Sequence, residues 1–165
     1  MAEPASVYKA LRAQGYLQGV SFPAFLAGVP IASDDNPQHG FAGSPYHKVS
    51  GTYGGILAAP LTRYAQRFGK AYDITGASMD ELVQHVMAGE PVAVWVTRNF
   101  EAPRTLHRYY GTVVSPGHTM TLVGYDAASR KLKVADPNAR GQYWVDWGTF
   151  ARSYDIMKMA IVVKK

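Results

Sequence analysis

The sequence predicts an α+β protein in which helices and loops come first and strands come last. Apolar residues recur at helical spacing before residue 90, short β-branched runs follow it, and no internal repeat or linker interrupts the chain. The 165 residues, 47% hydrophobic and 18% charged, can bury a core of ordinary size. We therefore expect a single domain over residues 1–165, with its helical and strand-rich parts segregated.

Two helices are predicted within the first 30 residues. Glu3 and Pro4 suit a first helical turn, because an acid favours the positive end of the helix dipole and proline needs no amide partner there. Apolar residues then repeat at helical spacing as far as Gly15, which can end the helix. Ser21 can cap a short second helix through Leu26.

The next stretch predicts a long loop and two further helices. Residues 30–56 are rich in Gly, Pro, Asp, Asn and Ser, and an ordered loop of that length is often functional. A third helix is expected to open at Pro60 and to stop at Gly69. Ser78 and Glu81 form a capping box that begins a fourth helix, because each side chain can satisfy a free amide of the other residue.

Five strands are predicted after residue 90. Short runs rich in β-branched and aromatic residues mark them at 91–96, 119–125, 131–135, 142–145 and 159–163. The runs at 119–125 and 131–135 are expected to pair as a hairpin. Asp146 can cap a short helix that extends to Tyr154.

His118 and Asp136 are the candidate functional pair. His118 follows a predicted turn at 115–117 and begins a strand, and Asp136 ends the neighbouring strand, so strand pairing could bring the two side chains together. An imidazole with a carboxylate that orients it is the arrangement of a catalytic base. Asn138 is an alternative orienter. A surface histidine and a plain Asp-Pro-Asn turn are the structural alternatives.

The charge pattern gives a weaker signal. The net charge of +5 is concentrated after residue 90, where the chain has eleven Lys and Arg residues but only five Asp and Glu residues. A basic half could attract nucleic acid, anionic cell wall or an acidic peptide. The basic residues are scattered without a nucleic-acid motif, so we favour an ordinary solvated surface and expect no nucleic-acid partner.

Cofactor, metal and membrane motifs are absent from the sequence. The remaining histidines are His39, His47, His85 and His107, and they have no spacing diagnostic of a metal site. No phosphate-binding loop occurs either, so we expect no metal and no cofactor. His39 and His47 fall in the long loop, His85 on a helix and His107 in a predicted loop. No apolar run approaches the ~20 residues of a membrane span.

The cysteine content and the first residues bear on location. The chain contains no cysteine, which excludes disulfides and thiolate zinc sites. The start of the chain has neither a basic region nor an apolar stretch typical of a signal peptide. We expect a secreted or cell-surface bacterial protein whose signal peptide is outside this chain, with a cytoplasmic protein as the alternative.

Several motifs, in order, resemble one known family. Residues 36–45 (NPQHGFAGSP) look like its NPxxGFxGxP loop, and residues 89–97 (GEPVAVWVT) look like its GxPVxVWVT strand. The pattern is completed by matches at 51–53, 60–61, 117–126, 136–137 and 143–145. The family is the bacteriocin-processing, double-glycine-leader peptidase-like group of papain-fold cysteine peptidases. The resemblance implies a papain-like fold, with an N-terminal helical lobe packed on a C-terminal antiparallel sheet, and a peptide or protein substrate.

The resemblance also implies a role for each site residue. In that family a cysteine begins the first helix in a pattern like CExxS, and residues 2–6 here read AEPAS, so the nucleophile position falls on Ala2. His118 would act as base and then acid, and Asp136 would orient it during peptide-bond hydrolysis or a related acyl transfer. We expect Ala2 to lie near His118. The family's oxyanion-donating glutamine, upstream of the cysteine, has no counterpart in this chain.

Three explanations of the missing thiol stay open. The cysteine was replaced deliberately, the natural protein is a pseudoenzyme, or another nucleophile acts, with Ser6 the nearest candidate. The opposing hypothesis is a non-catalytic module that holds a peptide or a cell-wall ligand in the same cleft. The sequence indicates neither the particular substrate nor the oligomeric state.

Overall fold

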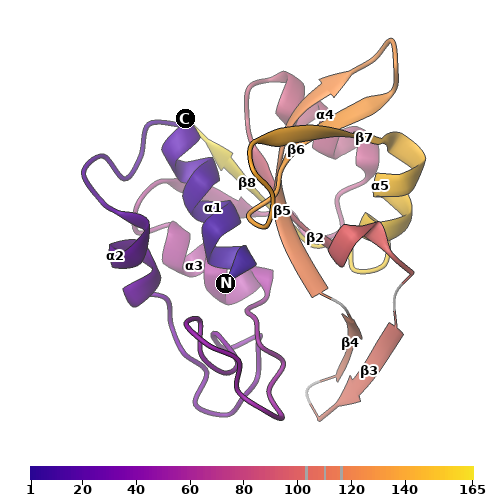
Figure 1. Ribbon diagram of the computed structural model, residues 1–165. Helices are drawn as coiled ribbons and strands as arrows, with labels where there is room; N and C mark the ends of the chain where they lie inside the picture. Colours follow the sequence, from indigo (N-terminus) through magenta and orange to yellow (C-terminus); the bar gives the residue numbers. More distant parts are fainter. Residues whose placement is uncertain (103, 110, 116) are drawn as a thin grey trace.

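A six-stranded antiparallel sheet forms the centre of the structure, a computed structural model (Figure 1). The structure describes residues 1–102, 104–109, 111–115 and 117–165, with the backbone alone described at 105–107 and 111–115. The strands, in their order across the sheet, are β1 (Lys70–Asp73), β8 (Ala160–Lys164), β2 (Val92–Thr97), β5 (Gly117–Asp126), β6 (Lys131–Ala135) and β7 (Gln142–Asp146).

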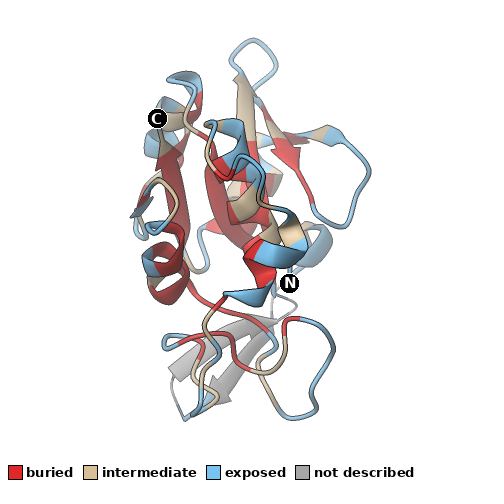
Figure 2. Ribbon diagram, turned by 90° about the vertical axis from the view of Figure 1, so that its left-hand side faces the viewer, coloured by how far each residue is buried: buried red, intermediate tan, exposed pale blue. Residues whose placement is uncertain are grey.

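Helices cover both faces of this sheet. The helices α1 (Ala2–Ala13), α2 (Phe22–Ala27) and α3 (Ala58–Ala65) pack on one face, and α4 (Met79–Met87) and α5 (Trp147–Tyr154) pack on the other (Figure 1). Every residue of β2 is buried, within the buried middle of the sheet (Figure 2). Its side chains alternate between the two faces: Ala93 and Trp95 join the core under α1–α3, and Val92, Val94 and Val96 join the core under α4 and α5. The predicted α+β fold class is confirmed.

Local sequence signals explain several helix ends. Ser78 and Glu81 form the predicted capping box, and the Ser21 hydroxyl accepts a hydrogen bond from the third residue of α2. Asp146 occupies the N-cap position of α5 but its side chain makes no capping bond. The boundaries predicted for α3 were wrong at both ends: it begins two residues before Pro60, which proline tolerates because first-turn amides lack helical partners, and it ends at Ala65.

Three extended segments and one turn were missed by the sequence patterns. They are β1, the 3-10 turn η1 (Arg98–Phe100) and a separate hairpin of β3 (Arg104–Arg108) and β4 (Gly111–Ser115). His107 therefore lies in a strand, not in a loop. The turn predicted at 115–117 includes Pro116, which lies outside the described residues.

The long loop at 30–56 is ordered by backbone pairing. Isolated bridges join Ile31 to Phe41 and Ala42 to Gly55. Gly40 lets the two arms approach, because a Cβ there would lie 2.8 Å from the Ala32 amide nitrogen. The loop thereby holds a fixed position beyond one end of the sheet, next to the start of α1 (Figure 1).

Candidate active site

Strand pairing brings His118 and Asp136 to the same end of the sheet. In the β5–β6 ladder Thr121 lies opposite Ala135, so His118, three residues before Thr121, is a near neighbour of Asp136, which directly follows Ala135. The His118 Nε2 and Asp136 Oδ1 atoms are 2.7 Å apart, and their side chains are only 3% and 9% exposed. The predicted hydrogen bond between the two side chains is therefore confirmed, and the pair is shielded from solvent rather than open at the rim of a cleft.

Asp136 is held by three donors. Its Oδ1 also accepts a hydrogen bond from the Asn138 backbone amide at 2.9 Å, and its Oδ2 accepts one from the Tyr143 hydroxyl at 2.9 Å. Asp136, rather than the alternative Asn138, thus contacts the imidazole. Asn138 contributes through its backbone, because the turn after β6 folds its amide back onto the carboxylate.

Tyr143 is the site residue that sequence reasoning missed. The sequence shows it only as part of the family motif at 143–145. Tyr143 lies on β7 opposite Val134 of β6, and Val134 precedes Asp136 by two residues. Residues two apart on a strand share a face, so the register brings the phenol toward Asp136. The alternation of β6 and β7 could have suggested this contact, but only with their register known.

The hydrogen bonds set the protonation of this cluster. Burial acts to raise the pKa of Asp136, but the bonds from the Asn138 amide, His118 and Tyr143 outweigh it and lower the pKa below its usual value. Burial and the adjoining Asp136 carboxylate together raise the pKa of Tyr143 to about 12. At neutral pH the cluster therefore holds an ionised Asp136 and a protonated Tyr143.

The ionised carboxylate fixes the imidazole tautomer. Asp136 can only accept, so Nε2 of His118 carries the proton in their shared hydrogen bond. In the neutral ring the other nitrogen, Nδ1, then keeps its lone pair. An oriented imidazole with a free lone pair is the form that a general base requires.

The start of α1 lies beside the residues that flank Asp136 in the sequence. Ala2 is the first residue of the helix, and it lines a hollow of about 290 Å³ together with Ala135, Pro137 and Asn138, the residues that flank Asp136. The positive end of the helix dipole at this point favours an anion such as a thiolate. The closeness of Ala2 to His118 itself stays a prediction.

Ser6 lines the same hollow from the next turn of α1. Its hydroxyl is buried and has no hydrogen-bond partner among the described residues, whereas its carbonyl accepts a bond from Thr121 at 2.9 Å. A mid-helix hydroxyl usually bonds to the backbone or faces solvent, and the Ser6 hydroxyl does neither among the described residues. Nothing in these contacts provides a base to activate Ser6.

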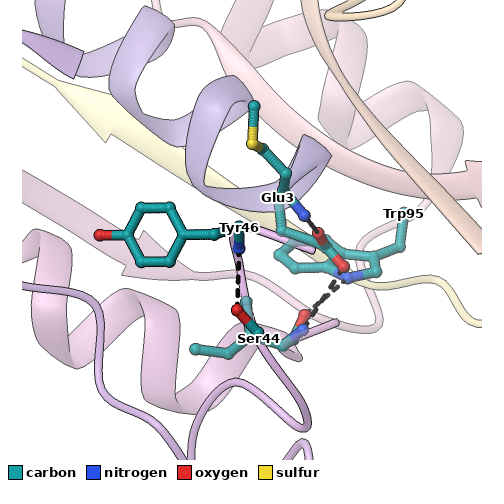
Figure 3. Close-up of polar contacts among 6 residues, drawn as sticks. Glu3, Ser44, Tyr46 and Trp95 are labelled. Atoms are coloured by element: carbon teal, nitrogen blue, oxygen red, sulfur yellow. Dashed lines mark hydrogen bonds and ion pairs between the residues drawn. The ribbon is translucent and has the colours of Figure 1, made fainter. Parts of the chain in front are cut away.

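A buried carboxylate anchors the start of α1 to the long loop (Figure 3). The Glu3 carboxylate accepts two hydrogen bonds, one on Oε2 from the Ile56 amide at 3.4 Å and one on Oε1 from the Met1 ammonium at 3.3 Å. The Ile56 carbonyl in turn accepts a hydrogen bond from the Trp95 indole of β2 at 3.2 Å. Gly55 leaves the room for this contact, because a Cβ there would collide with the Glu3 carboxylate. The helix start is thereby fixed relative to the sheet.

The remaining histidines do not join the site. His39 pairs with Asp34 at 2.6 Å on the surface, and His85 pairs with Glu90 at 2.7 Å at the end of α4. Within the part of the chain that the structure describes, no group of three or more His, Cys, Asp or Glu side chains is placed to hold a metal ion. No described helix is long and apolar enough to cross a membrane.

A helical layer on an antiparallel sheet, with an imidazole–carboxylate pair at its end, defines a papain-like protein of the cysteine-peptidase type. The chain belongs to the Peptidase C39-like family, whose family model matches residues 3–162. The crystal structure of a proposed C39-like peptidase from Bacillus anthracis is similar, with 25% sequence identity, a TM-score of 0.83, and coverage of 99% of this chain and 88% of that one. No curated protein matches the chain.

Proposed function

We propose that this chain is a peptide-binding C39-like protein that keeps the base and orienter of a cysteine peptidase but, with alanine at position 2, does not hydrolyse its ligand. The observation that carries the proposal is the buried hydrogen-bonded cluster of His118, Asp136 and Tyr143. A surface histidine needs no such support. The cluster holds one imidazole in one tautomer, which proton transfer by a general base requires.

The missing part is the attacking atom. With a thiol at position 2, His118 would take the thiol proton on Nδ1, and the thiolate would attack the peptide carbonyl carbon. The imidazolium would then protonate the leaving amine, and water activated by the same ring would hydrolyse the thioester. Asp136 would stabilise the imidazolium at each of these stages. Because the chain has no cysteine, the first step has no nucleophile here.

Restoring the thiol tests this assignment. We expect the single cysteine of Ala2→Cys to have a pKa lowered from ~8.5 into the range ~3.5–7.5, because a helix start and a nearby imidazolium both stabilise a thiolate. The measurement is the rate of alkylation by iodoacetamide as a function of pH. His118→Ala in the same background should move the thiol pKa back toward ~8.5.

The absence of native cysteine provides a matched control. Ala13→Cys places a single exposed thiol at the opposite end of the same helix, where the dipole gives no help to an anion. Its alkylation profile should show a pKa at or above ~8.5. A thiol at position 2 that titrates like the one at position 13, with or without His118, would overturn the peptidase-type site and favour a binding module without catalytic ancestry at this position.

A further inference from the structure

A second hollow beside the candidate site is lined by cations from separate parts of the chain. It has a volume of about 700 Å³ and lies between the loop at 44–54 and the segment from η1 to β3. Its lysine and arginine residues are Lys48, Arg98, Arg104 and Arg108, and all four are exposed. We call it the basic hollow. Its size is within the usual ~300–1,000 Å³ of a ligand site.

The fold, rather than the local sequence, collects these charges. Arg104 and Arg108 are four residues apart on β3, so the strand's alternation places them on one face. Arg98 follows β2 directly, where the chain turns sharply through Asn99 at a φ of 54°. Lys48 comes from the long loop, about fifty residues earlier in the sequence. These segments lie beyond the same end of the sheet (Figure 1).

Little negative charge opposes them. Among the described residues that line the basic hollow, Glu3 is the one carboxylate, and it already receives the Met1 ammonium and the Ile56 amide. The loop acids Asp34 and Asp35 do not line the hollow, although both act electrostatically on Tyr109, the residue after Arg108, and Asp34 is paired with His39. In the described ranges, no ion pair involves any of the four cations. Their field is therefore available to a bound anion.

We propose that the basic hollow binds an acidic segment of the peptide ligand, and this inference rests on the proposed function for the position of the peptide beside the start of α1. Gly117, which directly precedes His118, lines the basic hollow, and Met1 lines both this hollow and the smaller one beside Asp136. A peptide that follows the two hollows would pass the start of α1. Its carboxylates would meet the cations while Tyr46, 64% exposed in the same wall, offers apolar contact.

The test compares two labelled peptides. One is an alternating glycine–glutamate dodecapeptide, and the other is the same chain with glutamine in place of glutamate. Fluorescence anisotropy with the full chain should show at least about tenfold tighter binding of the glutamate peptide at ~0.01 M salt, and this preference should shrink by ~0.3 M because the charges are exposed. Equal binding of the two peptides would overturn the proposal.

Charge reversals locate the binding. Arg104→Glu/Arg108→Glu, and separately Lys48→Glu/Arg98→Glu, should each weaken binding of the glutamate peptide by about tenfold or more. The control, Arg63→Glu/Arg152→Glu, makes the same change in net charge on exposed faces of α3 and α5. It should weaken binding by less than about twofold. Two pairs on different elements guard against a fold defect in either one, and circular dichroism checks each protein.

Two outcomes would overturn the inference without touching the proposed function. Equal weakening in all three double variants would show a response to net charge alone. Tighter binding of a single-stranded oligonucleotide than of the glutamate peptide would assign the basic hollow to nucleic acid. Neither outcome concerns the thiol at position 2, so under the proposed function Ala2→Cys should keep its lowered thiol pKa in either case.

Discussion

Replacement of Tyr143 by phenylalanine tests the cluster around Asp136 without changing the volume of the core. The substitution removes one hydrogen bond to a buried carboxylate, at 2.9 Å, and leaves Oδ2 without that partner. Hydrogen bonds to charged groups contribute about 1.5–3 kcal/mol, so we expect Tyr143→Phe to lower the free energy of unfolding by about 1–3 kcal/mol at pH 7. For a chain of this size each 1 kcal/mol corresponds to a Tm loss of roughly 2–4 °C.

The pH dependence distinguishes this mechanism from a simple packing defect. The folded-state pKa of Asp136 is lowered, so its contribution to stability is present above its unfolded pKa of ~3.9 and is lost as pH falls through the folded value. Tyr143→Phe removes one of the bonds that lower this pKa. The stability difference between wild type and variant should therefore be largest at neutral pH and should narrow below about pH 4.

Urea unfolding at neutral and acid pH measures both effects. Tyr72→Phe is the matched control, because Tyr72 lies on the edge strand β1 with 44% of its surface exposed. It should change stability by less than about 0.5 kcal/mol at either pH. A Tyr143→Phe protein as stable as wild type at pH 7, or one with the same deficit at neutral and acid pH, would refute the coupling of this hydroxyl to the Asp136 charge.

Two further predictions concern the orienter and a helix cap. In the Ala2→Cys background, Asp136→Asn should raise the thiol pKa, because the imidazolium that stabilises the thiolate loses its carboxylate partner. If the pH profile of alkylation is unchanged, Asp136 does not orient the imidazole. Ser78→Ala should cost about 1 kcal/mol in urea unfolding, because the Glu81 amide loses the Ser78 hydroxyl at 3.2 Å, whereas Ser78→Asp should retain most of the stability.

The sequence by itself determined the parts of this protein that depend on neighbours in the chain. The capping box at Ser78 predicts the start of α4, and the β-branched runs predict the pairing of β5 with β6. That pairing was enough to predict the contact of His118 with Asp136, because both residues lie within a few positions of one hairpin ladder. The absence of a thiol is likewise a property of the sequence alone.

Only the tertiary structure decided the contacts that cross between distant segments. Tyr143 reaches Asp136 because of the register between β6 and β7. A one-residue slip of that register would place the Tyr143 side chain on the other face of the sheet. The basic hollow is lined by Lys48 and Arg104, which come from segments whose sequences do not indicate that they lie close together. The hairpin of β3 and β4 was missed because neither run has a strong alternating pattern. Such placements follow from the packing of whole elements, and local propensity carries no information about them.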